Sequence, residues 1–207
     1  MNPVSLSVDV LSKRYSRTHL FADLSFSATP GSLLMIRGKN GAGKSTLLRI
    51  LAGLERPTSG DCWLTTTAKR WPTRERREWI GVCAPDFHVY EELTAWENLG
   101  LFYRLRRLPF NADEAAALLD TAQLLRHQHK AMALASSGMR QRLKLLLASL
   151  HHPPLLLLDE PESNLDSEGS QFLSNLVSAA RSNGIVIVAT NDPLAELQPD
   201  RTILLDL

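Results

Sequence analysis

The residues most able to do chemistry lie in one glycine-rich run, 38–46, which reads Gly-Lys-Asn-Gly-Ala-Gly-Lys-Ser-Thr. Its spacing fits G-x-x-x-x-G-K-[ST], a loop whose backbone N–H groups surround nucleotide phosphates. Glycines make this possible because they lack a Cβ and let the backbone approach an anion closely. We expect Lys44 to neutralise β- and γ-phosphate oxygens and the Ser45 hydroxyl to bind Mg²⁺. The nucleotide-binding residues predicted in this run are Gly38, Asn40, Gly41, Ala42, Gly43, Lys44, Ser45 and Thr46.

Two neighbouring acids, Asp159 and Glu160, are the second candidates. They follow the apolar run 155–158, which reads as a buried strand, and ligands of open α/β sheets bind at the carboxyl ends of strands. We expect Asp159 to hold Mg²⁺ and Glu160 to orient or deprotonate an attacking water. The alternative is that the two acids only cap the turn after the strand.

The apolar runs predict the elements that must position these residues. Residues 32–36 read as a buried strand entering the loop, and 46–52 as the helix leaving it, ended by Gly53. Other strands are predicted at 4–10, 20–28, 62–64, 79–84, 185–189 and 202–205, and a further helix at 170–181. Fully apolar strands that alternate with helices predict a parallel sheet covered on both faces.

Segment 86–149 is helical in character and reads as an insertion into the α/β domain. Its apolar residues between 93 and 103 recur at three- to four-residue spacing. A second helix at 115–125 is predicted to be capped by Asn111 or Asp113, and a third, strongly apolar one is predicted at 143–150.

Two charged segments are predicted to have structural roles and not to bind ligands. The stretch 69–78 carries both signs of charge and is predicted to be a solvated helix face. His151 and His152 are predicted to be cations favoured by the dipole at a helix end, not metal ligands.

Composition limits the functional classes. The 207 residues fit one domain, 1–207, and a net charge of +1 gives no electrostatic case for a nucleic-acid partner. Cys62 and Cys83 are isolated, so neither a disulfide framework nor a zinc site is expected, and a reducing cytosol is the natural compartment. No segment resembles a signal peptide, and the apolar run 153–158 is too short to span a bilayer. Any membrane association is expected to go through another chain.

Residues 135–142, Ala-Ser-Ser-Gly-Met-Arg-Gln-Arg, resemble the L-S-G-G-Q signature of ABC-type ATPases, and they lie between the phosphate loop and the paired acids as in that family. The resemblance extends over essentially the whole chain. Its other elements are the D-loop-like residues 163–166, the L-T-x-x-E-N-L helix start at 93–99, the turn 57–60 and an aromatic residue at Tyr15.

The family resemblance implies a P-loop NTPase core with a mainly parallel sheet, an N-terminal antiparallel β subdomain and a helical subdomain at roughly 86–149. It implies ATP and Mg²⁺ as cofactors and a head-to-tail dimer, homomeric or heteromeric, with two ATP molecules at the interface. Each ATP would lie on one subunit's phosphate loop and be closed by the other's signature, where the helix N-terminus offers donors to a γ-phosphate. The further binding residues so implied are Tyr15, Ser136, Ser137, Gly138 and Asp166. The alternatives are that 136–138 is a simple helix N-cap and that Tyr15 is an ordinary strand residue.

Three departures from the family's pattern bear on catalysis. The glutamine expected after the strand 79–84 is replaced by Pro85 and Asp86, and Asp86 can still offer an oxygen to the metal. The switch histidine is replaced by Asn191, which can hydrogen-bond a phosphate but cannot become cationic. The signature itself departs at Ala135, Ser137 and Met139.

We therefore hypothesise that the chain binds Mg·ATP well but hydrolyses it slowly when alone. The residues expected to carry out hydrolysis are Glu160, Asn191 and Lys44, which act by positioning and charge stabilisation. The alternative is that Asn191 and Asp86 are working substitutes.

The leading functional hypothesis is the ATP-binding subunit of a membrane transporter, at the cytoplasmic face of the membrane. Transmembrane permease subunits would contact residues 86–103, where aromatic side chains offer anchors. The alternative is that these rings fill the core of the helical subdomain. They are Phe87, Tyr90, Trp96, Phe102 and Tyr103.

Two other functions are alternatives to this hypothesis. The first is a regulatory or structural ATP-holding partner in a heterodimer with a catalytically competent subunit. The second, a mechanoenzyme of DNA repair or chromosome organisation, is disfavoured because no sustained heptad pattern exists. Among transporters, the compact chain resembles the ATP-binding subunits of haem exporters.

Overall fold

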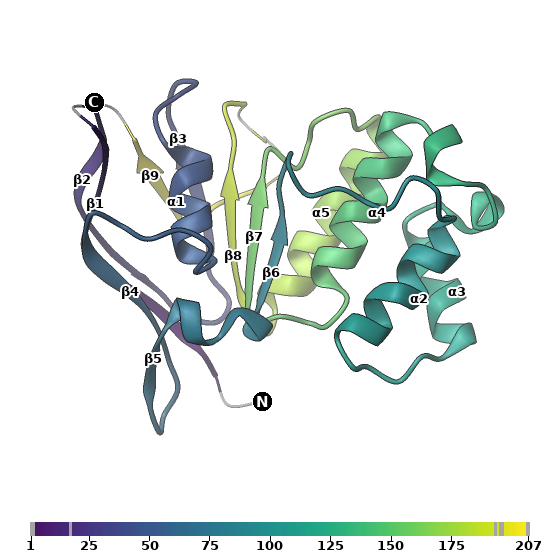
Figure 1. The fold of residues 1–207 in the computed structure, drawn as a ribbon, viewed down its shortest axis with the longest axis horizontal. Coiled ribbons are helices and arrows are strands. Elements are labelled where there is room, and N and C mark those ends of the chain that lie inside the picture. The colour runs from purple at the N-terminus through teal and green to yellow at the C-terminus, as the bar shows by residue number, and fades with distance from the viewer. Residues whose placement is uncertain (1–2, 17, 193, 195–196, 206–207) are drawn as a thin grey trace.

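A five-stranded parallel sheet lies at the centre of the fold, as the apolar strands predicted (Figure 1). The computed structural model describes residues 3–16, 18–192, 194 and 197–205. The strands in spatial order are β6 (Ile80–Cys83), β7 (Leu155–Asp159), β8 (Ile185–Ala189), β3 (Leu33–Arg37) and β9 (Arg201–Leu204). The two ends of β7 and β3 that carry the predicted chemistry are thus separated by one strand, β8.

The register of these strands aligns their carboxyl ends. Ile36 of β3 pairs with Ala189 of β8, and Ala189 pairs with Asp159 of β7. Because carboxyl ends of parallel strands share one edge of the sheet, the phosphate loop, the paired acids and the segment after β8 all begin at that edge.

Successive residues of the central strands alternate between two cores. Leu155, Leu157 and Ile187 face a core that contains α1 (Lys44–Leu51) and the antiparallel sheet. Leu156, Leu158 and Val188 face a second core with α4 (Ser137–Ser149) and α5 (Ser167–Arg181). This alternation follows from the two-residue period of a strand and explains why the strands are apolar throughout.

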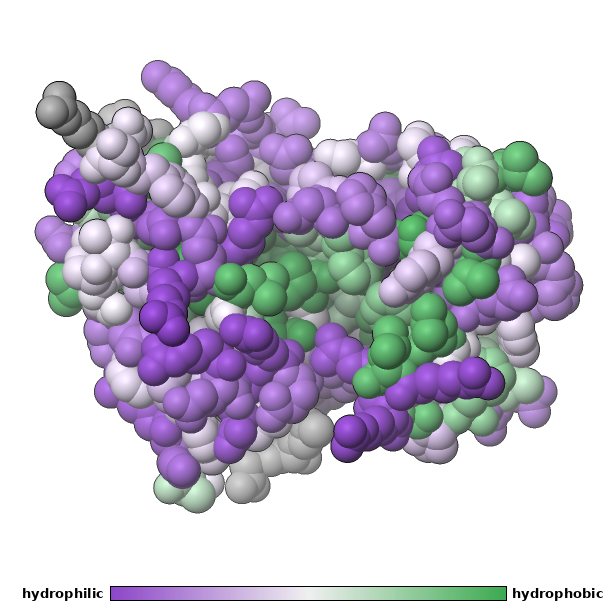
Figure 2. All heavy atoms as spheres, viewed as in Figure 1, coloured by the Kyte–Doolittle hydropathy of each residue, from purple (hydrophilic) through white to green (hydrophobic). Residues whose placement is uncertain are grey.

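The antiparallel sheet is formed mainly by the first third of the chain. Its strands in spatial order are β2 (Thr18–Ala28), β1 (Ser5–Tyr15), β4 (Ser59–Thr65) and β5 (Arg70–Pro72). Helix α1 lies between this sheet and the parallel one, since residues such as Leu47 and Leu51 share a core with both. On the face shown in Figure 2, hydrophobic side chains gather in the hollow between the two lobes of the molecule.

The helical subdomain begins with α2 (Ala95–Leu105) and α3 (Ala112–Thr121). Thr94 and Glu97 form a capping box at the start of α2, each side chain accepting the other's backbone N–H, at 3.1 and 2.9 Å. Asn111, one of the two predicted caps, accepts the N–H groups of residues 113 and 114. Short 3₁₀ helices occur at Thr73–Glu75, Arg77–Trp79, Leu125–His127 and Met132–Leu134.

The helix predicted at 69–78 is wrong, because the segment consists of β5 and two 3₁₀ turns. Pro72 disfavours helical geometry for the residue before it. The rings of Trp71 and Trp79 pack edge to face at 5.2 Å, and the Arg76 guanidinium lies 4.6 Å from the Trp71 ring centre. The pairing of β5 with β4 and this aromatic packing accompany the observed conformation, and the charge pattern reveals neither of them.

The predicted cation at His151 is also wrong. Burial, reinforced by the nearby charge of Arg106, lowers the pKa of His151 to about 4. The imidazole is therefore neutral near pH 7, because desolvation disfavours the charged form more than the end of α4 favours it.

The cysteines, possible metal-binding groups and possible membrane spans complete the description of the fold. Cys62 and Cys83 are both free and buried. Among the described residues, no group of histidines, cysteines and acids is arranged to hold a metal through three such ligands. No helix in the described part of the chain has the length and apolarity needed to cross a membrane.

Candidate nucleotide site

The glycine-rich loop connects β3 to α1 at the carboxyl edge of the parallel sheet. Gly43, the residue before α1, has φ 97°, a left-handed conformation that favours glycine. Gly38 is needed for a different reason, because a Cβ there would lie 2.5 Å from the Leu205 carbonyl oxygen. Both positions therefore require glycine for the loop to take this path.

Lys44 is the first residue of α1 and is buried, with 6% of its surface exposed. Its ammonium nitrogen donates to the carbonyl oxygens of Gly38 at 2.9 Å and Lys39 at 3.3 Å, and to Asn191 Oδ1 at 2.6 Å. These three contacts match the three donors of an ammonium group. The structure thus places the predicted cation inside the loop and joins it to the predicted switch residue.

Asp159 ends β7 and is almost fully buried. Burial raises the pKa of its carboxyl, and a hydrogen bond from Ser45 acts in the opposite direction. Its Oδ1 is buried without a hydrogen-bond partner among the described residues. A buried, unpaired carboxylate oxygen beside a hydroxyl fits Mg²⁺, which prefers oxygen ligands.

Glu160 follows directly and has a left-handed backbone, φ 45°. Its N–H donates to the Ala189 carbonyl oxygen at 2.8 Å, which fixes the turn against the end of β8. A strained residue held in place by its surroundings is a common feature of catalytic turns. The side chain is partly exposed, so it can meet a substrate water at this edge.

Asn191 follows β8 and contacts two residues of the phosphate loop. Besides receiving the Lys44 contact, its amide nitrogen donates to Asn40 Oδ1. Asp86, the other substituted position, forms an exposed ion pair of 2.9 Å with Arg49 of α1. A metal-binding role for Asp86 stays a prediction, because Arg49 already engages its carboxylate.

The signature-like segment begins α4. Ser136 is the N-cap and accepts the Met139 N–H at 3.2 Å, so the simple capping interpretation describes its local contact. A Cβ on Gly138 would lie 2.8 Å from the Asn164 carbonyl oxygen, so the signature packs closely against the D-loop-like segment. Asp166 caps α5 by accepting the Gly169 N–H at 2.8 Å.

Ser137 opens onto a polar cavity of about 170 Å³ between α4 and the segment after β6. Two cations and one acid are among the side chains of its wall, which is lined by His88, Val89, Glu91, Ser137, Arg140, Gln141, Lys144 and Asn164.

Tyr15, the predicted adenine platform, is about half exposed at the end of β1. Its hydroxyl donates to the Glu55 carboxylate, which raises the tyrosine pKa. The Lys13 ammonium lies 4.7 Å from the ring centre and covers part of one face. Adenine stacking stays a prediction.

The sequence interpretation missed Glu162. This residue lies just after the paired acids, and its carboxylate accepts a hydrogen bond from Thr190 next to Asn191. A third acid in the run Asp-Glu-Pro-Glu was the available signal, but the contact joins residues 28 positions apart and no local pattern reveals it.

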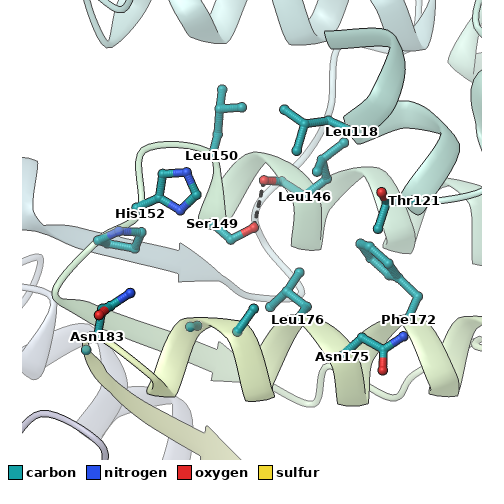
Figure 3. Close-up of a pocket in the computed structure, with 14 residues that line it drawn as sticks. Leu118, Thr121, Leu146, Ser149, Leu150, His152, Phe172, Asn175, Leu176 and Asn183 are labelled. Carbon is teal, nitrogen blue, oxygen red and sulfur yellow. Dashed lines mark hydrogen bonds between the residues drawn. The ribbon is translucent and has the colours of Figure 1, made fainter. Parts of the chain in front are cut away.

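A larger apolar cavity of about 370 Å³ lies between α3, α4 and α5 (Figure 3). Leu118, Leu146, Leu150, Phe172 and Leu176 point into it, and no Asp, Glu, Lys or Arg side chain lines it. Without an Asp, Glu, Lys or Arg side chain, this cavity does not suit a triphosphate, and the loop at the sheet edge is the better candidate for the nucleotide site.

Comparisons with known proteins agree with this geometry. The family described as ABC transporter matches residues 21–163. The chain is 34% identical over 206 residues to the sulfate/thiosulfate import ATP-binding protein CysA of Gloeobacter violaceus, which covers 97% of this chain and 59% of that protein. It is 33% identical to the phosphonates import ATP-binding protein PhnC 2 of a Synechococcus species, over 96% of this chain and 80% of that one. The chain therefore spans less than two thirds of the first relative's length.

Among solved structures, the chain resembles a dimeric ATP-binding cassette, MJ0796, in a post-hydrolysis state bound to ADP and Pi. The TM-score is 0.77 at 25% identity, over 90% of this chain and 88% of that one.

Proposed function

This chain belongs to the ABC transporter family of ATP-binding domains, and from that premise we propose that it binds Mg·ATP and hydrolyses it to power a membrane transporter. The observation that carries the proposal is the convergence of Lys44, Asp159 and Asn191 at one edge of the parallel sheet. An ammonium group, a buried carboxylate and a hydrogen-bonding amide are what a triphosphate with its metal requires.

Each residue has a role that follows from its chemistry. Lys44 neutralises phosphate oxygens, and Glu160 orients water or accepts its proton. Ser45 and Asp159 would hold Mg²⁺, which supplies charge neutralisation to the phosphates when bound.

We propose that the active form is a head-to-tail dimer, homomeric or heteromeric. Two observations support this. The similar cassette with ADP and Pi is dimeric, and Ser136 of the signature accepts the Met139 N–H at the start of α4, away from the phosphate loop of its own chain. In a dimer, Ser136, Ser137 and Gly138 would face the partner's nucleotide, and Asp166 would lie near them at the start of α5.

Slow hydrolysis by the isolated chain is tested by Asn191→His. A histidine can become cationic and hydrogen-bond the terminal phosphate. We expect phosphate release to rise by about tenfold or more, within the range of general acid–base contributions. The matched control is Asn183→His, an exposed position between α5 and β8. Fast turnover by the wild type, or no gain in Asn191→His, would contradict slow hydrolysis and favour Asn191 as a working substitute.

We propose that residues 86–103 receive the permease, which would hold this chain at the cytoplasmic face of the membrane. Tyr90 is 51% exposed, and the polar cavity lies beside His88. Tyr103 is buried, and the Phe87 and Phe102 rings pack together at 5.8 Å, so part of the aromatic set does fill the subdomain core. Tyr90 is therefore the anchor proposed for the interface.

Tyr90→Glu is expected to reduce co-purification of the permease by about tenfold, because a charge replaces an exposed aromatic anchor. Affinity for Mg·ATP should stay within about twofold of the wild type, since no phosphate contact is touched. Leu105→Glu, at the end of α2 and 64% exposed, is the control for added charge. Equal recovery of the permease with both variants would refute the assignment of Tyr90.

The alternative proposal is an ATP-holding regulatory partner in a heterodimer. The favouring observation is Asn191 in place of a titratable switch residue. Turnover that is lost only when the other chain's base is mutated would support it. Haem is the cargo suggested by the family resemblance. Identifying the permease that co-purifies with this chain tests that suggestion.

A further inference from the structure

Glu162 is a carboxylate that the proposed reaction does not use. It lies just beyond β7, and burial raises its pKa. Oε1 accepts a hydrogen bond from the Thr190 hydroxyl, whereas Oε2 is buried without a partner among the described residues. Burying a carboxylate with one partner costs free energy, so packing alone does not explain an acid at this position.

Thr190 links this carboxylate to the segment after β8. The residue is fully buried, and its N–H donates to the Ile36 carbonyl oxygen at 3.1 Å. Its hydroxyl oxygen accepts the Asp192 N–H at 3.0 Å while its proton is directed to Glu162. A hydroxyl can donate once and accept twice, so both contacts form together. They fix the backbone on both sides of Asn191.

Asn191, held in this way, presents its carboxamide to the phosphate loop. Its Oδ1 is occupied by the Lys44 ammonium at 2.6 Å, and one amide N–H is directed to Asn40. The second amide N–H is then the group that can meet a phosphate next to Lys44. ADP lacks the terminal phosphate that this donor would reach.

We propose that Glu162 is a positioning residue that acts through Thr190 to hold the Asn191 carboxamide against Lys44, so that the site distinguishes ATP from ADP. The inference rests on the proposed nucleotide function. The neutral groups of Thr190 and Asn191 carry the contact from the acid to the loop, which keeps the carboxylate from facing the phosphates directly.

The test is the affinity of the full chain for Mg·ATP and Mg·ADP, measured by calorimetry. Glu162→Ala and Thr190→Val should each weaken ATP binding by about tenfold, the loss of roughly one hydrogen bond to a charged group, and change ADP binding by less than about twofold. Thr190→Ser and Glu162→Gln keep the hydroxyl and its acceptor and should restore ATP affinity. Glu168→Ala removes an exposed acid at the start of α5 and is the matched control.

A double variant separates positioning from general structural support. In an Asn191→Ala background, Glu162→Ala should add no further loss, because the residue it positions is gone. An equal loss in both backgrounds, or unchanged ATP affinity in Thr190→Val, overturns the inference and leaves the proposed function intact. A wild-type chain that binds neither nucleotide overturns both. Melting curves identify variants that fail to fold, and Thr190→Val, which keeps its shape, decides the matter if Glu162→Ala is one of them.

Discussion

Replacing Lys44 with alanine is expected to weaken Mg·ATP binding by at least about a hundredfold. The ammonium group is buried inside the loop, where we expect it to bind β- and γ-phosphate oxygens. Hydrogen bonds to charged groups contribute about 1.5–3 kcal/mol each, so the loss of two bonds to phosphate reaches this size. Calorimetric titration of the folded variant with ATP and magnesium gives the measurement.

The matched control is Lys39→Ala. Lys39 lies in the same loop, but its side chain is exposed, and only its carbonyl oxygen contacts Lys44. The control should keep wild-type affinity within about threefold, the size of a small surface effect. If Lys44→Ala binds as tightly as the wild type, the loop is not the triphosphate site.

Glu160→Gln is expected to reduce ATP turnover by about a hundredfold or more while ATP affinity changes little. Glutamine keeps the shape of the side chain but cannot accept the proton of the attacking water, and general base contributions are typically 10²- to 10⁴-fold. The backbone contact that holds the turn, from Glu160 N–H to Ala189, does not involve the side chain.

Single-turnover phosphate release and calorimetry on the same preparation separate the two effects for Glu160. The control is Glu91→Gln, an exposed acid in the helical subdomain. Turnover that survives Glu160→Gln would move the role of general base to another group and remove the main reason for assigning catalysis to this turn.

The sequence was sufficient to predict the central sheet because its strands are apolar throughout, and that pattern follows from burial on both faces. The motif spacing also predicted that Lys44 and Asp159 meet at one edge. The prediction of a helix at 69–78 was wrong because the charge pattern does not reveal the pairing of β5 with β4 or the packing of Trp71 against Trp79. The prediction of a cationic His151 was wrong because burial, which no charge pattern reveals, lowers its pKa more than the helix dipole raises it.

Within the candidate site, local motifs predicted which residues would surround the phosphates but not how these residues are joined to one another. The contact from Lys44 to Asn191 and the link from Glu162 to Thr190 both connect distant parts of the chain. Such contacts depend on strand order and register, and those were not deducible from spacing. The ion pair of Asp86 with Arg49 has the same origin and shows that a substituted position can acquire a different partner.

Helix α1 carries a consequence for the whole molecule. Its first residue, Lys44, belongs to the candidate nucleotide site, and its apolar side chains lie in the core that joins both sheets. Ligand occupancy and folding are therefore thermodynamically linked, and saturation at a hundred times the dissociation constant adds about 2.7 kcal/mol to the free energy of unfolding. Cellular abundance of this chain should accordingly follow the supply of nucleotide, because vacant molecules visit the unfolded, protease-sensitive ensemble more often.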